Sequence, residues 1–563
     1  MKRAISSGLL VLILLIIATP VSAKKPVSTE KSNTDHIRQI QTEAIQNKKS
    51  PVAHWGFDPE NYTQWSTHSL RLIPVYTFGT RKKGKGINLN SYARKNSPYR
   101  NQKSLEKIYG FLPENTLNAE AKYLDQTNLY DLQQAALKAG KKNIILFVFD
   151  GMDWQTTKAA ALFYTGEDNY KSGRGTGLHF QNYRAKGTSQ FGYMVTAPHN
   201  DGTTVDVNQQ SVINPGGKKR GGYNATKGGA NPWTAGNDKK YLVGSVKNNY
   251  GEHAYPDSAN TASSMTAGIK SYNSAINVDP TGARVSTIAH EAQQKGYAIG
   301  VVTSVPVTHA TPAAAYAHNV SRNDYQDLAR DLLGQPSISH PENPLPGMDV
   351  VLGGGFGTVE TPAGAKKQGT NFRPGWRYIS EETIKKVDVN NKGKYTVAVR
   401  TPHKEGRCGL RKATQLAIKN KTRLLGVYGV KEYSAHLPYQ TANGDFQPAP
   451  GLKNSAEVYS KSDLKENPTL AEMTDSAIRV LSQNKNGFWL MVEAGDVDWA
   501  NHDNNLDNTI GAVKSGDAAF KVITDWVEKN SNWNETVVIL TADHGHYLHI
   551  DQPEALIPPK KKE

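Results

Sequence analysis

The sequence predicts an α/β fold, with a mostly parallel central sheet, helices on both faces, an inserted cap region and an irregular N-terminal arm. Continuous apolar runs of five to six residues are typical of strands that are buried on both faces. Segments with apolar residues at helical spacing alternate with these runs, which favours parallel strands joined by helices. The predicted strands span residues 144–149, 298–303, 487–492 and 536–540, and residues 350–352 and 424–427 are further strand candidates.

The remaining elements divide the chain into regions. We expect helices over residues 154–164, 258–270, 285–295, 470–481 and 510–527. We expect the chemistry in the two core halves. The arm shows only scattered aromatic residues and short helical patches, and its sequence indicates no chemistry. The predicted regions are an arm (24–140), a first core half (141–329), an insertion or cap (330–465), a second core half (466–550) and a basic tail (551–563).

Residues 1–23 have the composition of a secretory signal peptide. Lys2 and Arg3 precede an apolar run, and small residues at 21–23 form a cleavage site. The run is shorter than the ~20 residues that a bilayer span needs, so we expect an exported protein, periplasmic or secreted, with no membrane association after cleavage. The single cysteine, Cys408, excludes an intrachain disulfide.

The chain carries 67 Lys and Arg against 51 Asp and Glu, a formal net charge of +16. Loss of Lys2 and Arg3 with the signal leaves 16 − 2 = +14, which favours anionic partners. The basic residues crowd with glycine into residues 171–174, 216–222 and 227–240, as in solvated loops. Since no nucleic-acid-binding module accompanies them, we expect no specific nucleic-acid partner.

The stretch 255–270 is the first candidate for chemistry. Pro256 ends the preceding segment, Asp257 is a natural N-cap, and Ala262, Met265 and Ile269 recur at helical spacing. Ser258 would therefore lie at a helix N-terminus, where free N–H groups and the helix dipole favour an anion. A serine needs a base or a metal to become a nucleophile, and Asp-Ser at a helix start taken alone is more often only a cap.

Polar residues cluster where the predicted strands end. In open α/β sheets ligands bind at the carboxyl ends of the strands, so these side chains should meet at one edge. Carboxylates and imidazoles suit zinc, while carboxylate and hydroxyl oxygens suit magnesium. Each has an ordinary structural explanation, but together they predict a metal site. The residues are Asp150, His309, Thr311, Glu493, Asp498, His502, Asp543 and His544.

These motifs give the chain a resemblance to the alkaline phosphatase family over about residues 141–322 and 470–546. The motifs follow the order of the family, and several of them are specific. They are Phe149-Asp150-Gly151-Met152, Asp257-Ser258-Ala259, His309-Ala310-Thr311-Pro312, Ser321-Arg322, Val492-Glu493-Ala494-Gly495-Asp496-Val497-Asp498, His502 and Thr541-Ala542-Asp543-His544.

The resemblance implies a phosphomonoesterase that acts on phosphate monoesters through a phosphoserine. It implies Ser258 as nucleophile and Arg322 as phosphate clamp, with two Zn²⁺ and one Mg²⁺. One zinc would take Asp150, Asp543, His544 and Ser258, the other Asp498 and His502, and magnesium would take Asp150, Thr311 and Glu493. Family members carry either Asp or His at the position of His309. Members with His are expected to differ at the magnesium position in affinity or in metal preference. The resemblance is compatible with a homodimer.

One departure concerns the second zinc. The family places a third histidine some forty residues beyond the Asp-His pair, whereas 563 − 544 = 19 residues follow His544 here and lack such a motif. His546 or His549 substitutes, solvent fills the position, or the protein is impaired. Zinc with two protein ligands would bind more weakly than with three.

Two other functions stay open. A phosphodiesterase of the same superfamily usually has threonine at the nucleophile position, and a sulfatase needs a Cys or Ser-x-Pro-x-Arg motif, which the segments at Cys408 and Ser304 lack. The second alternative is a catalytically impaired relative that binds phosphate or polyanions, suggested by the missing histidine and the basic loops.

Overall fold

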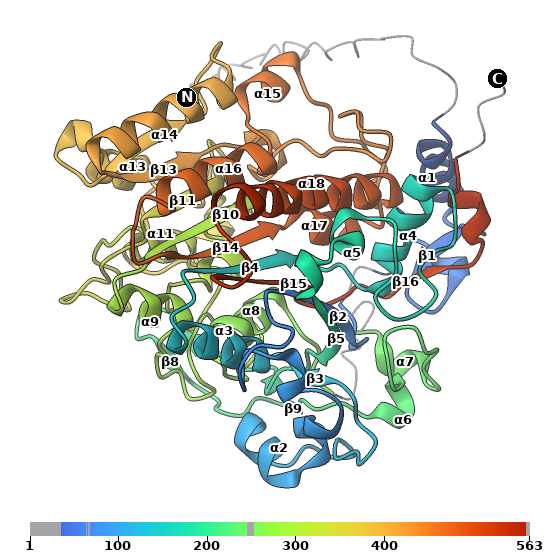
Figure 1. The fold of residues 1–563 in the computed structure, drawn as a ribbon. Helices are drawn as coiled ribbons and strands as arrows, with labels where there is room; N and C mark the ends of the chain where they lie inside the picture. The colour runs from blue at the N-terminus through green and yellow to red at the C-terminus, as the bar shows by residue number, and fades with distance from the viewer. Residues whose placement is uncertain (1–34, 64, 66–67, 245–252, 559–563) are drawn as a thin grey trace, which may run out of the picture. The chain divides into compact units, whose positions relative to one another are not determined.

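The computed structural model describes residues 35–558, except residues 64, 66–67 and 245–252. The predicted signal peptide and Lys560–Lys562 of the basic tail lie outside the described residues. The predicted α/β class is confirmed: ten strands form one sheet, and helices cover both of its faces (Figure 1). Among the described residues, no helix combines the length and apolar character that crossing a membrane requires.

The central sheet is parallel except for one strand. Only β2 runs against its neighbours, since it pairs antiparallel with both β15 and β5. In spatial order the strands are β12 (Tyr395–Val399), β13 (Arg423–Val427), β11 (Val350–Gly354), β10 (Ala298–Pro306), β14 (Phe488–Ala494), β4 (Asn143–Phe149), β15 (Thr536–Ala542), β2 (Ile73–Phe78), β5 (Gln190–Val195) and β3 (Leu124–Asp125).

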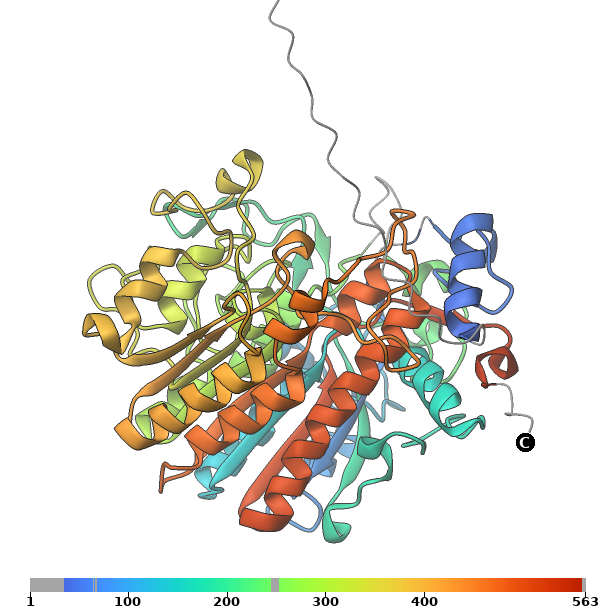
Figure 2. The same ribbon diagram turned by 90° about the horizontal axis from the view of Figure 1, so that it is seen from above.

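The four strands predicted from apolar runs are the centre of this sheet. Every residue of β4, β10, β14 and β15 is buried, which is why their sequences are apolar without alternation. One face packs against α14 (Gly406–Asn420), α16 (Leu470–Leu481) and α18 (Leu506–Asn530), which lie side by side in Figure 2. The other face packs against α3 (Asn128–Lys138), α8 (Ser258–Ala267) and α9 (Ile288–Gln294).

Two regions differ from the expectations. The N-terminal arm is not irregular: besides α1 (His36–Asn47), α2 (Gln102–Tyr109) and β1 (Ala53–Trp55), it supplies β2 and β3 to the central sheet. Residues 330–465 are not only an insertion, because β11, β12 and β13 extend the parallel sheet beside β10. The strand candidates at 350–352 and 424–427 are confirmed as β11 and β13, whereas β2, a short apolar run within the polar arm, was not predicted from the sequence.

Candidate active site

The register of the central strands brings the predicted site residues to one edge of the sheet. Ala494 of β14 and Ala542 of β15 both pair with Phe149 of β4. Asp150 and Asp543 follow these aligned positions directly. Glu493, one residue earlier on β14, pairs with Thr303 of β10. Parallel strands that end at the same level therefore deliver three buried carboxylates to one place.

Ser258 lies at the first position of α8, as predicted. Asp257 is the N-cap, and its side chain accepts a hydrogen bond from the Asn260 N–H at 3.1 Å. The Ser258 hydroxyl is 3.4 Å from Asp150 Oδ1 and 3.2 Å from His544 Nε2. A hydroxyl at a helix N-terminus, beside a carboxylate and an imidazole, is placed where an anionic group can be bound and where the oxygen can be activated.

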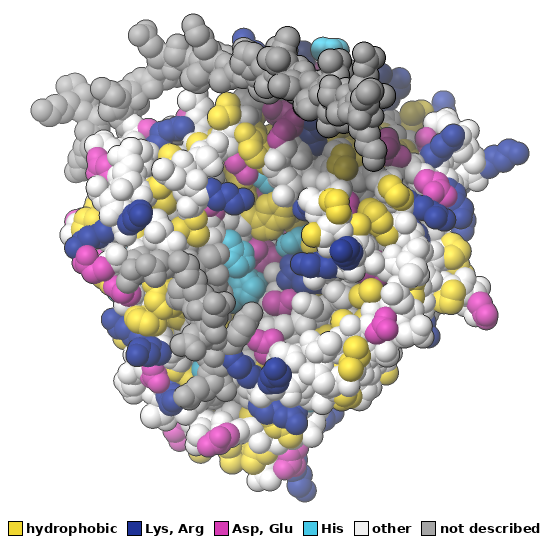
Figure 3. All heavy atoms as spheres, turned by 180° about the vertical axis from the view of Figure 1, so that it is seen from behind, with side chains coloured by type: hydrophobic (Ala, Val, Ile, Leu, Met, Phe, Trp, Pro, Cys, Tyr) yellow, Lys and Arg dark blue, Asp and Glu magenta, His cyan; other side chains and the backbone are white. Residues whose placement is uncertain are grey.

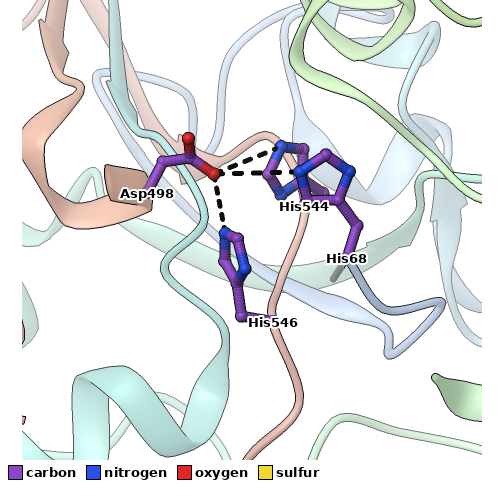
Figure 4. A group of neighbouring side chains, drawn as sticks. All are labelled: His68, Asp498, His544 and His546. Atoms are coloured by element: carbon purple, nitrogen blue, oxygen red, sulfur yellow. Dashed lines mark hydrogen bonds and ion pairs between the residues drawn. The ribbon is translucent and has the colours of Figure 1, made fainter. Parts of the chain in front are cut away.

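Three histidine side chains surround one oxygen of Asp498 (Figure 4). His546 Nε2 lies 2.6 Å from Asp498 Oδ1, and the Nε2 atoms of His544 and His68 each lie 3.9 Å from it. Asp498 and His502 come from one short helix, α17 (Asp496–His502), where their spacing of four residues puts both on one side, 3.5 Å apart. Imidazoles that converge on one carboxylate oxygen are a donor set that zinc prefers.

His68 was not predicted from the sequence. Its Nδ1 lies 2.7 Å from the Pro256 carbonyl, so Nδ1–H donates and Nε2 keeps its lone pair. That Nε2 is 3.0 Å from Nε2 of His502. Metal-binding histidines commonly donate their other ring N–H to a backbone carbonyl in this way, which fixes the tautomer. The only sequence signal is one histidine shortly before the apolar run of β2, which is weak in itself.

Of the two histidines considered as the extra zinc ligand, only His546 lies in the group. His549 belongs to β16 (Leu548–Ile550), which pairs with β1. Its Nε2 is 3.5 Å from Asp551, and its side chain is 37% exposed. His546 lies before β16, in the segment that leaves β15, and reaches Asp498, whereas the pairing of β16 with β1 places His549 opposite His54 and beside Asp551.

The predicted magnesium ligands also lie together. The Thr311 hydroxyl donates to Asp150 Oδ2 at 3.2 Å, and the Thr303 hydroxyl donates to Glu493. Burial, together with Asp543 and Asp498, raises the pKa of Glu493 to about 8, although hydrogen bonds from its neighbours act in the opposite direction. Burial and the carboxylates of Asp498, Asp543 and Glu493 raise the pKa of Asp150. So much buried negative charge fits a site for cations, which would favour the ionised carboxylates.

His309 and Arg322 form a separate pair within the site. Nε2 of His309 accepts a hydrogen bond from Arg322 Nη2 at 3.2 Å, and Arg322 Nη1 donates to Asp257 Oδ2 at 3.1 Å. Burial and the guanidinium of Arg322 lower the pKa of His309 to about 3. Among the described residues, the side chain of His309 thus forms its hydrogen bond with Arg322 and not with the carboxylates of Asp150 and Glu493.

A cavity of about 690 Å³ opens over these groups. Figure 3 shows a hollow on this side of the molecule in which histidine and acidic side chains are visible. One wall comes from the predicted cap region and includes Tyr433, Tyr439 and Glu457. The floor is polar, and its residues include Ser258, Arg322, His68, Asp498, His502 and His309.

Known proteins of one family are similar to this chain. A family model described as alkaline phosphatase matches residues 223–555, more than half of the chain. The chain belongs to the alkaline phosphatase family. Alkaline phosphatase 3 of Bacillus subtilis is 30% identical over 52% of this chain and 50% of its own length. The Escherichia coli alkaline phosphatase is 31% identical over 54% of this chain and 60% of its own.

The chain spans about half the length of the first curated alkaline phosphatases it matches. A membrane-bound alkaline phosphatase of Bombyx mori is 28% identical over 72% of this chain and 60% of its own. Among solved structures, a cold-active alkaline phosphatase of Shewanella covers 72% of this chain and 68% of its own, with 21% identity and a TM-score of 0.42. His68 and Asp150 both precede the residues that the family model matches.

Proposed function

We propose that this protein hydrolyses phosphate monoesters at the cavity over Ser258, through a covalent phosphoserine. The observation that carries the proposal is the position of the Ser258 hydroxyl. It lies at a helix N-terminus, within 3.4 Å of Asp150 and His544, and on the floor of a cavity that it shares with Arg322. A structural cap would not need these neighbours, because Asp257 already caps the helix.

In the proposed reaction the Ser258 oxygen attacks phosphorus, and the bond between phosphorus and the alcohol oxygen breaks. The alcohol leaves with a proton, and water then cleaves the phosphoserine and releases inorganic phosphate. The free N–H groups at the start of α8 and the fork of Arg322 would hold the nonbridging oxygens. Asp257 and His309 would fix the guanidinium through the two bonds they make with it.

The donor groups fit two zinc sites and one magnesium site. Asp150, Asp543 and His544 would hold one zinc beside Ser258. Asp498 and His502 would hold the other, with His546 and His68 supplying the nitrogen that the sequence resemblance leaves unfilled. Asp150, Thr311 and Glu493 would hold magnesium. When bound, such ions supply positive charge that lowers the pKa of a nucleophile and stabilises a leaving oxygen.

His68 and His546 also bear on the alternative of an impaired binding protein. That alternative arose because the second zinc had only two protein ligands. With two further imidazoles beside Asp498, the donor set equals or exceeds the three protein ligands of many catalytic zinc sites, which supports turnover. Export and a homodimer remain predictions, and they rest on the sequence and on the resemblance respectively.

The test is Ser258→Ala with p-nitrophenyl phosphate as substrate. We expect the turnover to fall by about 10⁴-fold or more, because an activated nucleophile is lost. Ser264→Ala is the matched control: it lies on the same helix, and its hydroxyl donates only to the Asn260 and Ile269 carbonyls. The control should keep turnover within a few-fold if it folds.

Acid quenching during turnover, followed by mass spectrometry, should find phosphate on Ser258 in the wild type. A Ser258→Ala protein with one tenth of the wild-type turnover would contradict the covalent route. Faster hydrolysis of bis-p-nitrophenyl phosphate than of the monoester would favour the phosphodiesterase. Metal-loaded wild-type protein without any turnover would favour a binding protein.

A further inference from the structure

A second group of histidine and aspartate side chains lies outside the cavity over Ser258. His318, Asp331 and His340 each offer one ligand atom, and these atoms lie within 4.8 Å of one another. All three residues are buried, with 5%, 0% and 8% of their surface exposed. His318 follows α10 (Ala310–Ala313), Asp331 lies in the last turn of α11 (Tyr325–Leu332), and His340 lies in the loop before β11.

The hydrogen bonds of His318 leave one ring nitrogen for a ligand. Nε2 is 2.9 Å from the Val285 carbonyl, so Nε2–H donates and Nδ1 carries the lone pair. Nδ1 is buried and has no hydrogen-bond partner among the described residues. A histidine that donates its other N–H to a backbone carbonyl, with a bare nitrogen opposite, has the arrangement typical of a metal ligand. Without a ligand, that buried nitrogen is an uncompensated polar atom.

Asp331 connects the other two residues. Its Oδ2 accepts from the backbone N–H of His318 at 3.0 Å, and its Oδ1 lies 3.0 Å from His340 Nδ1. Two ligands at about 2.0–2.1 Å from a tetrahedral zinc are roughly 3.3 Å apart, so little movement is needed to bind an ion between them. Ser337 donates to Asp331 Oδ1 at 2.6 Å and holds the carboxylate in place.

His290 lies next to this group but is excluded as a ligand. Its ring stacks on that of His318 at 5.2 Å between centroids. Nδ1 of His290 accepts the backbone N–H of Thr287 at 3.0 Å, which places the ring proton on Nε2. With its proton on Nε2, His290 could bind a metal through that nitrogen only by moving the proton to Nδ1, which would break the bond to the Thr287 N–H. His290 therefore serves as a built-in control for the three ligands.

We propose that His318, Asp331 and His340 form an additional divalent-metal site, of the two-histidine, one-carboxylate type that zinc accepts. The site borders a second cavity of about 690 Å³, which is lined by His290, His318, His340, Arg284 and Glu342 and gives an ion a path from solvent. Three protein ligands leave a fourth position for water or a small anion from this cavity. The ion would join the residue after α10, the end of α11 and the loop before β11.

The experiment measures zinc per protein after chelator treatment, reloading with zinc and gel filtration. We expect Asp331→Asn and His340→Gln each to bind one equivalent of zinc fewer than the wild type. Both should keep turnover of p-nitrophenyl phosphate within about twofold, because neither residue lines the cavity over Ser258. His290→Gln should bind as much zinc as the wild type, since glutamine can still accept the Thr287 N–H at the third helical position.

Two substitutions are used because Asp331→Asn alone could disturb α11, and folding is checked by circular dichroism. Cobalt supplies a second readout: the difference in visible absorption between wild type and His340→Gln should show a four-coordinate nitrogen and oxygen site. Wild-type zinc content in both folded variants would overturn the proposal. Loss of turnover together with zinc in a folded variant would contradict a site separate from the cavity over Ser258.

Discussion

The two groups of metal-binding side chains in this protein are built in different ways. The group around Asp498 takes residues from the helix α17, from the segment after β15 and from His68, which lies more than 400 residues before both. The group of His318, Asp331 and His340 comes from one stretch of 23 residues, as 340 − 318 + 1 = 23. The first therefore depends on the whole sheet being assembled, whereas the second depends on one local arrangement around α11.

Their surroundings differ as well. The first group adjoins three further buried carboxylates and the Ser258 hydroxyl. The second has one carboxylate, and its neighbour Arg284 adds positive charge. High negative charge beside a nucleophile is suited to catalysis by several cations, while a single carboxylate with two imidazoles is suited to one ion. The predictions below separate the two groups by their effects on turnover, metal content and stability.

The largest effect after Ser258→Ala is expected for His68→Ala. Removing a nitrogen from the group around Asp498 should lower turnover by about 100-fold or more and lower zinc content by up to one equivalent. The readouts are p-nitrophenyl phosphate kinetics and metal analysis at limiting zinc. Because the contacts of this segment with Gly244 and Gly545 are made by the backbone of His68 and Ser69, the fold should persist. Full turnover at limiting zinc would remove His68 from the site.

A smaller but similar loss is expected for His546→Ala, of about 10- to 100-fold in turnover at limiting zinc. His546 is 2.6 Å from Asp498, whereas His549 faces Asp551. His549→Ala is therefore the matched control and should keep both zinc and turnover. If the two variants behave alike, the distinction that the structure makes between these histidines is wrong.

Arg322→Lys should affect phosphate more than metal. Lysine keeps the charge but cannot engage two oxygens at once, nor can it keep the bonds to both Asp257 and His309. We expect inhibition by inorganic phosphate to weaken by about 10-fold, with unchanged zinc content. Unchanged inhibition by inorganic phosphate in the variant would remove Arg322 from the phosphate site.

The smallest effects concern pH, and in chelator-treated protein they have opposite signs at Glu493, in the active site, and at His290, beside the group of His318, Asp331 and His340. Burial lowers the pKa of His290 from 6.5 to about 3, so the unfolded chain binds more protons below pH 6.5 and stability falls as the pH falls toward 3. Burial raises the pKa of Glu493 from 4.5 to about 8, so the folded protein binds more protons between these values and stability falls as the pH rises.

Urea unfolding at pH 5, 6.5 and 8 tests this difference. His290→Gln should flatten the acidic side of the stability profile and Glu493→Gln the alkaline side, each by on the order of 1 kcal/mol. Zinc and magnesium should remove most of the effect of Glu493, because bound cations favour its ionised form. Parallel profiles for both variants and the wild type would show that neither buried group titrates differently on folding.

Much of the active site follows from the sequence alone. Asp150, Glu493 and Asp543 come at the ends of long apolar runs, and such runs form buried parallel strands whose carboxyl ends share one edge. Asp257 and Ser258 stand at a helix start that local capping chemistry is sufficient to define. The α/β class and the family were predictable for the same reason, since these signals are local and strongly patterned.

Only the tertiary structure decided the rest. His68 reaches Asp498 because β2 pairs antiparallel with β15. This contact joins residues more than 400 positions apart, and no short-range pattern in the arm predicts it. The same holds for the place of β11, β12 and β13 in the sheet: the apolar runs at 350–352 and 424–427 predict two of these strands, but long-range pairing sets them beside β10. His309 turns to Arg322, and His546 to Asp498, because of neighbours that the chain brings together only on folding. Sequence patterns fix which segments form strands and helices, but partners distant in the chain are chosen by packing and charge in the assembled protein.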